Sequence, residues 1–192
     1  MPSTLETRRL TLSKPRLADV PDLFEFLGDP RAMIHTNCDE SLAQCRRRIA
    51  VHEWKRRING YAPWVIRERN APKPIGWGGL YDDPFYPGWG IELAYYFHPA
   101  CWGKGYGTEL AEAALDVADN DLAAPLVSAF AHPDNRASNR LLEKVGFRWQ
   151  RYLPDMDRNL YHRHSPGLEP QATTPGRADR PPSIRLPGTS DT

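Results

Sequence analysis

The chain has 192 residues, of which 40% are hydrophobic, and this is enough for one domain with a sizeable core. Lysine and arginine total 25 against 24 aspartates and glutamates, so the net charge of +1 gives no general reason to expect nucleic acid or an acidic membrane as the main partner. No apolar run approaches about 18 residues, and the N-terminus is charged where a signal peptide is apolar, so the sequence predicts a cytoplasmic protein.

The three cysteines are Cys38, Cys45 and Cys101. Their odd number and the absence of a C-x-x-C pair argue against a disulfide framework and a zinc knuckle. His35 and His52 could be added to the first two as metal ligands, but the spacing fits no structural zinc pattern. The sequence therefore predicts free thiols and no metal site.

The first predicted element is a strand over residues 7–13, in which Leu10 and Leu12 share one face. Asp19 then occupies a helix N-cap position, and apolar residues at helical spacing follow until Gly28 ends the helix.

A second helix is predicted over residues 41–58. Its many basic residues indicate a solvated face. The alternative is a patch that recognises an acidic acceptor or nucleic acid, and nucleic acid is the weaker of these two because few aromatic residues accompany the basic ones. These residues are Arg46, Arg47, Arg48, Lys55, Arg56 and Arg57.

Residues 62–68 and 75–81 are expected to form a hairpin, with a turn over 69–74. The loop that follows, residues 82–89, contains two prolines and three aromatic residues. Such a loop can shape a pocket or pack as a surface turn, and the sequence leaves both open.

The next stretch runs from a strand over residues 91–97, through a glycine-rich turn over 103–107, into a helix that ends near Val117. Glu92 is the one carboxylate in the apolar strand, whose composition is typical of a strand buried on both faces. The glycines therefore lie at a helix N-terminus, where unpaired main-chain N–H groups and a partial positive charge can hold a phosphate.

Two common phosphate loops do not fit this turn. No glycine is followed by Lys and then Ser or Thr, as the ATP-binding loop requires. The dinucleotide fingerprint would need a third glycine where the chain has Thr108 or Leu110.

Residues 102–107, WGKGYG, resemble instead the coenzyme A pyrophosphate loop of the GCN5-related N-acetyltransferase (GNAT) superfamily, [QR]-x-x-G-x-[GA]. Trp102 stands where many members have Gln or Arg. The longer stretch GIELAYYFHPACWGKGYGTEL is similar to the RimJ/RimL-like branch, the ribosomal-protein alanine acetyltransferases. A tight turn with no ligand is the alternative.

A strand over residues 124–131 precedes a helix that begins near Asn135 and ends at Gly146. The segment NRASNRLLEKVGFRW resembles the same acetyltransferase branch. Strands over 147–153 and 159–164 close the domain. We expect one GNAT domain over residues 1–164, and a disordered proline-rich tail over residues 165–192.

The resemblance implies a mixed α+β fold with a mostly antiparallel central sheet of about seven strands, helices on both faces, and a splayed strand pair that holds acetyl-CoA. The two strands of that pair begin near Ile91 and Pro125. It also implies the cofactor contacts: main chain near Tyr96, Phe97 and His98 for the pantetheine, and Gly103, Lys104, Gly105, Tyr106, Gly107 and Thr108 for the pyrophosphate. Asn135 is a further cofactor contact, or a helix cap only.

Direct attack of an amine on the thioester needs a base, an acid and a donor to the oxyanion. Glu92 is the candidate base, with a purely structural carboxylate as the alternative. A main-chain N–H near Phe97 or His98 is the candidate oxyanion donor. Many members supply the acid from a tyrosine at the position that Leu142 occupies here, so the resemblance leaves Ser138 as the candidate acid. Tyr95, Tyr96 and Tyr161 are further alternatives.

The sequence therefore predicts an acetyl-CoA-dependent N-acetyltransferase acting on a primary amine, either a protein N-terminus or a small molecule. An acyl-CoA-binding regulatory or scaffolding module with little turnover is the alternative, because the usual tyrosine is absent. No metal, nucleic acid or membrane partner is expected, and a homodimer is left open.

Overall fold

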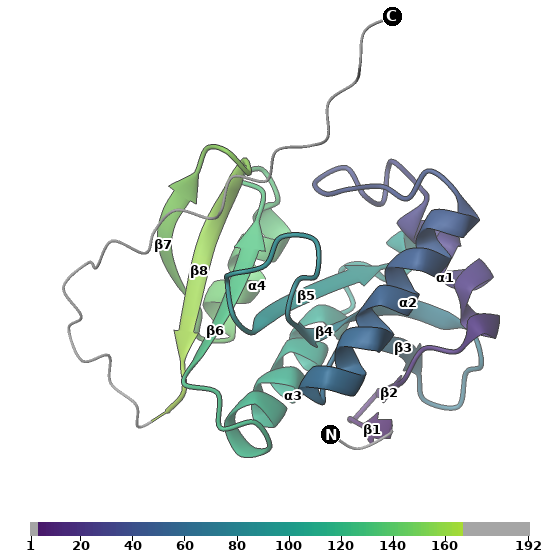
Figure 1. Cartoon of the computed structure of the whole chain (residues 1–192), viewed down its shortest axis with the longest axis horizontal. Helices are drawn as coiled ribbons and strands as arrows, with labels where there is room; N and C mark the ends of the chain where they lie inside the picture. Colours follow the sequence, from purple (N-terminus) through teal and green to yellow (C-terminus); the bar gives the residue numbers. More distant parts are fainter. Residues whose placement is uncertain (1–3, 167–192) are drawn as a thin grey trace, which may run out of the picture.

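The computed structural model describes residues 4–166, which form an eight-stranded sheet with the order β1-β2-β3-β4-β5-β6-β8-β7 (Figure 1). This confirms the predicted mixed fold, with one strand more than expected. The strands are β1 (Thr4–Glu6), β2 (Leu10–Ser13), β3 (Trp64–Glu68), β4 (Pro74–Tyr81), β5 (Glu92–Phe97), β6 (Leu126–Ala131), β7 (Arg148–Leu153) and β8 (Arg158–His164).

The sheet is antiparallel except between β5 and β6. These two parallel strands pair only at Glu92 and Ser128, where Ser128 N donates to Ile91 O at 2.8 Å. Beyond this pair they separate, so β1–β5 stand on one side of Figure 1 and β6, β8 and β7 on the other. The predicted splayed pair is therefore present, and it leaves main-chain groups of both strands without a strand partner.

Helices α1 (Val20–Leu27) and α2 (Leu42–Asn59) pack on one face of the sheet, and α3 (Tyr106–Asn120) and α4 (Arg136–Lys144) contribute to the core on the other. Side chains alternate between the faces along β3, as strand geometry requires: Val65 joins the α1–α2 core, whereas Trp64 and Ile66 join the α3–α4 core. Short 3₁₀ helices occur over Leu17–Asp19 and Pro99–Cys101.

Local signals in the sequence explain most boundaries of these helices. Ser41 caps α2 by accepting a hydrogen bond from Gln44 N, and Gly60, in a left-handed conformation, ends that helix. Asn135 caps α4 by accepting from Ser138 N. Asp19 precedes α1, but its carboxylate is directed to Arg16 N and to Arg67 instead of to the helix.

Two expectations are corrected. The strand predicted over residues 7–13 begins at Leu10, because residues 7–9 form the turn to β1, which sequence reasoning missed. Arg56 was expected on a solvated face, yet it is buried, with its guanidinium donating to Glu53 and to Pro63 O.

The three cysteines are free, and no cluster of metal-binding side chains occurs within residues 4–166. None of the helices in this part of the chain is both long and apolar enough to span a bilayer. The predicted disordered tail starts too early at residue 165, because Ser165 donates hydrogen bonds to Pro125 O and to Asp119. From residue 167 onward the predicted tail lies outside the described residues.

Candidate active site

The glycine-rich turn presents a row of unpaired N–H groups at the start of α3. Gly103 and Gly105 have φ angles of 73° and 78°, a left-handed conformation that disfavours residues with a Cβ. The first N–H of α3 that bonds back along the helix belongs to Glu109, which donates to Gly105 O. Within the described residues, no hydrogen bond uses the N–H groups of residues 103–108. An anion placed there would meet several main-chain donors and the positive end of the helix.

Side chains from the N-terminal hairpin hold this turn in place. The Glu109 carboxylate accepts hydrogen bonds from Thr7 Oγ1, from Arg9 N and from Arg9 Nε, each at 2.6–2.7 Å. Arg9 also donates to Lys104 O at 2.8 Å and lies 4.7 Å from the centre of the Tyr106 ring. Sequence reasoning missed the role of Arg9, since it lies about a hundred positions from Glu109 and no local pattern marks the pair.

The main chain at the end of β5 presents alternate residues to the gap beside β6. His98 N donates to Ile75 O at 2.9 Å, and hydrogen bonding alternates along an antiparallel pair, so Tyr96 also bonds to β4. Tyr95 and Phe97 therefore direct their main-chain groups away from β4. Of the two candidate oxyanion donors, the Phe97 N–H is the free one, while Phe97 O accepts from Trp102 Nε1.

A cavity of about 930 Å³ opens beside these groups. Of the predicted cofactor contacts, His98 and Lys104 do not line it; the His98 side chain instead accepts from Ala100 N. The predicted residues that do line it are Tyr96, Phe97, Gly103, Gly105, Tyr106, Gly107, Thr108, Asn135 and Ser138. The structure thus brings together residues from β5, the glycine turn and α4.

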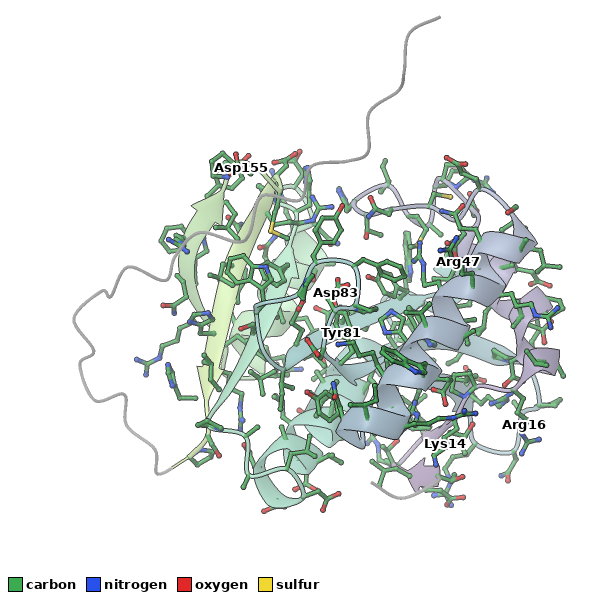
Figure 2. The ribbon with its side chains drawn as sticks, viewed as in Figure 1. Lys14, Arg16, Arg47, Tyr81, Asp83 and Asp155 are labelled. Atoms are coloured by element: carbon green, nitrogen blue, oxygen red, sulfur yellow. The ribbon has the colours of Figure 1, made fainter. Side chains whose placement is uncertain are left out.

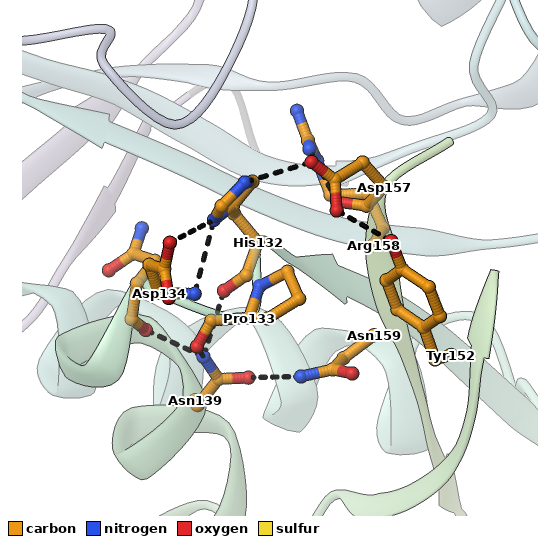
Figure 3. Close-up of polar contacts among 9 residues, drawn as sticks. His132, Pro133, Asp134, Asn139, Tyr152, Asp157, Arg158 and Asn159 are labelled. Atoms are coloured by element: carbon orange, nitrogen blue, oxygen red, sulfur yellow. Dashed lines mark hydrogen bonds and ion pairs between the residues drawn. The ribbon is translucent and has the colours of Figure 1, made fainter. Parts of the chain in front are cut away.

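A polar network fixes the turn between β6 and α4, which forms one wall of this cavity (Figure 3). His132 Nδ1 accepts from Asp134 N, so its Nε2–H faces the Asp157 carboxylate at 3.1 Å. The side-chain amide of Asn139 donates to the carbonyls of residues 132, 133 and 135. The network holds Asn135, whose Oδ1 caps α4 and whose amide nitrogen makes no hydrogen bond within the described residues.

Two hydroxyl groups meet inside the cavity. Tyr95 on β5 and Ser138 on α4 are joined by a hydrogen bond of 2.8 Å between their side-chain oxygens. Burial raises the pKa of Tyr95 to about 12, so the phenol keeps its proton near neutral pH. Leu142, which is 1% exposed, lies one helical turn after Ser138 on the same face of α4.

Glu92 lies on the other side of the splayed strands, in a second cavity of about 770 Å³. It is 3% exposed, and its Oε1 has no hydrogen-bond partner among the described residues. Burial and the nearby Asp83 carboxylate raise the pKa of Glu92 to about 8, against the opposing effect of the Tyr81 hydroxyl. Figure 2 shows Tyr81 and Asp83 near the middle of the molecule, between Arg47 on α2 and Asp155 at the β7–β8 turn.

Residues 9–148 match the family model described as an acetyltransferase (GNAT) domain. The chain belongs to the GNAT acetyltransferase family. It shares 26% identity and a TM-score of 0.76 with an acetyltransferase from Agrobacterium tumefaciens, over 86% of this chain and 95% of that one. It is also 26% identical to the uncharacterised protein YkkB of Bacillus subtilis. That match extends over 150 residues, which are 78% of this chain and 87% of YkkB.

Ribosomal-protein acetyltransferases are among the solved GNAT structures that share this fold. The ribosomal-protein-S5-alanine acetyltransferase of Vibrio fischeri has a TM-score of 0.70 at 14% identity, over 87% of this chain and 99% of that one. RimL, an L7/L12 N-acetyltransferase solved with coenzyme A, has a TM-score of 0.68 at 16% identity, over 84% of this chain and 98% of that one. At these identities, the neighbours show that the chain shares their fold.

The side chains and main chain of this GNAT domain fit coenzyme A. A diphosphate needs main-chain donors, which residues 103–108 supply, and a pantetheine arm needs an unpaired strand edge, which the gap between β5 and β6 supplies. No Cβ built on Gly103 would meet another atom within 4 Å, so open space lies beside the turn.

Proposed function

We propose that this protein transfers the acetyl group of acetyl-CoA directly to a primary amine, without a covalent enzyme intermediate. The observation that carries the proposal is the row of unpaired N–H groups over residues 103–108 at the edge of the 930 Å³ cavity, beside the splayed strands. The acceptor is a protein N-terminus or a small molecule, as among RimL-like proteins and amine acetyltransferases in general.

The cofactor side of the site acts through main chain. The N–H groups of residues 103–108 hold the diphosphate, and the free edge of β5 aligns the pantetheine arm. Bound acetyl-CoA supplies an activated thioester. The Phe97 N–H points into the gap where the thioester carbonyl would lie, and it can stabilise negative charge on that oxygen.

Glu92 acts as the general base. Its carboxylate lies at the pairing point of β5 and β6 and lines the second cavity, so an amine in that cavity can reach both Glu92 and the gap. A pKa near 8 is close to working pH, which is the range in which a base is both available and strong enough.

The acid is supplied by Tyr95 together with Ser138. Side chains on a helix lean toward its N-terminus, so a tyrosine at position 142 would place its hydroxyl over the turn that contains Ser138. The Tyr95 hydroxyl already lies at Ser138, although it comes from β5. A phenol therefore reaches the region of α4 where other family members carry one, and it can protonate the departing thiolate.

A binding module without turnover is the second candidate, and Leu142 is the observation that favours it. The Tyr95–Ser138 pair weakens that case, because the missing hydroxyl is replaced from another strand.

Two measurements test the proposal. Calorimetry should detect binding of coenzyme A, and a thiol-release assay with acetyl-CoA should detect turnover on at least one primary amine or N-terminal peptide. Binding without thiol release on any acceptor would favour the second candidate. If coenzyme A gives no heat and no thermal stabilisation, both candidates are wrong.

A further inference from the structure

The second cavity, which contains Glu92, is lined largely by aromatic side chains. It measures about 770 Å³ and draws its lining from α2, β4, β5, β6, the first residue of β8 and three loops, over residues 36–40, 83–89 and 155–156. Aromatic rings form much of its wall, and they come from Trp77, Tyr81, Phe85, Tyr86, Trp89, Tyr96 and Phe130. Several are in contact with one another: Trp77 stacks on Tyr96 with centres 5.9 Å apart, and Trp89 meets Phe130 at 5.2 Å. A flat or apolar body would fill such a space.

Of the carboxylates that line this cavity, Glu92 and Asp83 are shielded from solvent and lack a cationic partner among the described residues, whereas Glu40 and Asp155 are exposed. Neither Glu92 nor Asp83 forms an ion pair within residues 4–166. Burial is the main cause that raises the pKa of each, and the charge of Asp83 adds to the rise at Glu92. The Asp83 Oδ1 atom accepts from the N–H groups of Phe85 and Tyr86, so the main chain of its own loop fixes its position.

The basic residues around the cavity do not form ion pairs with Glu92 or Asp83 in the part of the chain that the structure describes. Arg48 pairs with Asp39 at 2.8 Å, and Arg158 donates to Asp157 O. Burial lowers the pKa of His52 to about 4, so His52 is neutral at physiological pH. Arg47 is exposed on α2. None of these basic residues therefore forms an ion pair with Glu92 or Asp83 within the described residues.

Apart from the Asp39 carboxylate, which is ion-paired with Arg48, three buried polar atoms in the lining residues have no hydrogen-bond partner among the described residues. They are Glu92 Oε1, His52 Nδ1 and Trp77 Nε1, on side chains that are 3–5% exposed. Leaving such atoms unpaired costs free energy, so a bound molecule that hydrogen-bonds to them is favoured. Glu92 Oε1 in particular can accept a hydrogen bond from a ligand group such as an amine.

We propose that this cavity binds the acceptor as an organic ammonium ion with an aromatic or apolar body, with Asp83 holding its charge and Glu92 taking its proton. The inference rests on the proposed function and narrows its acceptor. The overall step balances: R–NH₃⁺ and acetyl-CoA give R–NH–acetyl, coenzyme A as the free thiol, and one proton. The N–C bond forms as the C–S bond breaks, and the proton from the ammonium passes through Glu92 to solvent.

The first test is binding of three matched amines to the full chain without acetyl-CoA, measured by calorimetry. Phenethylamine carries the ring and the cation, phenylalanine adds a carboxylate, and phenylalaninamide replaces that carboxylate with a neutral group. Phenethylamine and the amide should bind about tenfold or more tightly than phenylalanine, because Asp83, which has no cationic partner among the described residues, repels a carboxylate on the ligand. Equal or tighter binding of phenylalanine would mean that the arginines set the preference, and the inference would be wrong.

The second test compares two charge-removing variants of neighbouring residues. Asp83→Asn keeps an oxygen for the loop hydrogen bonds but removes the charge that faces the cavity. Asp82→Asn is the control, since Asp82 does not line the cavity and pairs with Lys55 at 2.9 Å. Phenethylamine affinity should fall about tenfold in the first variant and by no more than about threefold in the second, with coenzyme A affinity unchanged in both. Unchanged amine affinity in Asp83→Asn would overturn the inference.

Failure of the inference and failure of the proposed function give different results. Thiol release with a free amino acid, and none with phenethylamine or phenylalaninamide, would leave the acetyltransferase standing and overturn the acceptor class. Amine binding with the Asp83 dependence, but no binding of coenzyme A, would support the cation site and overturn the proposed function.

Discussion

The two cavities on either side of the splayed strands are built in opposite ways. The cavity of 930 Å³, here called the cofactor cavity after its proposed role, has unpaired main-chain N–H groups in one continuous segment, residues 103–108. The cavity of 770 Å³, called the acceptor cavity after its proposed role, obtains its polar groups from side chains on α2, β4, β5 and a loop, as in His52, Trp77, Glu92 and Asp83. Main-chain donors tolerate changes of side chain as long as the backbone path is kept, whereas a side-chain site changes with every substitution. One fold can thus keep the same acetyl donor while the amine that accepts the acetyl group changes.

The largest effect should come from the acceptor side. Glu92→Gln should lower kcat by roughly 10²- to 10⁴-fold, the usual contribution of a general base. The affinity for coenzyme A, measured by calorimetry, should not change, because Glu92 does not line the cofactor cavity. In the wild type, kcat/KM should rise with pH and level off above about 8, as Glu92 loses its proton. Equal loss of activity and coenzyme A affinity would assign Glu92 to structure.

The same substitution should also change how stability depends on pH. The pKa of Glu92 is raised from 4.5 to about 8 by folding, so between these values the unfolded state releases a proton that the folded state keeps. Wild-type stability therefore falls as pH rises through this window. The free energy of unfolding of Glu92→Gln, relative to that of the wild type, should therefore increase between pH 5 and pH 9. The increase should be a few kcal/mol and at most ~5 kcal/mol. Urea unfolding at both pH values checks this, and a pH-independent difference would contradict it.

The cofactor side can be probed with two glycines in the same backbone conformation. Gly103 and Gly60 have φ angles of 73° and 83°, and a Cβ on either would meet no atom within 4 Å. Replacing either with alanine should cost about 1 kcal/mol of stability, because alanine disfavours this conformation. Only Gly103→Ala should weaken coenzyme A binding, by about tenfold, since Gly60 ends α2 far along the chain from the turn. Equal affinities in the two variants would argue against the diphosphate site.

The smallest expected effect concerns the support of the turn. Arg9→Ala removes the contacts to Glu109 and Lys104, and coenzyme A affinity should fall about threefold as the turn loosens. Arg8→Ala is the matched control, because Arg8 is exposed and its side chain forms no hydrogen bond or ion pair among the described residues. Calorimetry on both variants separates the loss of a positive charge from the loss of support. Similar affinities would show that the glycines alone hold the turn.

Features that depend on neighbouring residues along the chain could be predicted. The glycine turn and the cap at Asn135 were both found, and the turn was placed correctly at the start of a helix. The splayed strands were expected only from the resemblance to the family. The loop over residues 82–89 was left between a pocket wall and a surface turn, and the structure places Asp83, Phe85, Tyr86 and Trp89 in the wall of the acceptor cavity.

The sequence by itself determined where an anion can bind, because a left-handed glycine and the free N–H groups of a helix start are local properties of the backbone. Tertiary structure alone decided that Tyr95 meets Ser138, that Arg9 supports the turn and that Asp83 lies near Glu92 without a counter-ion. Each of these depends on which residues from distant segments share a small volume. That is fixed by the packing of helices on the sheet, and no local pattern encodes it.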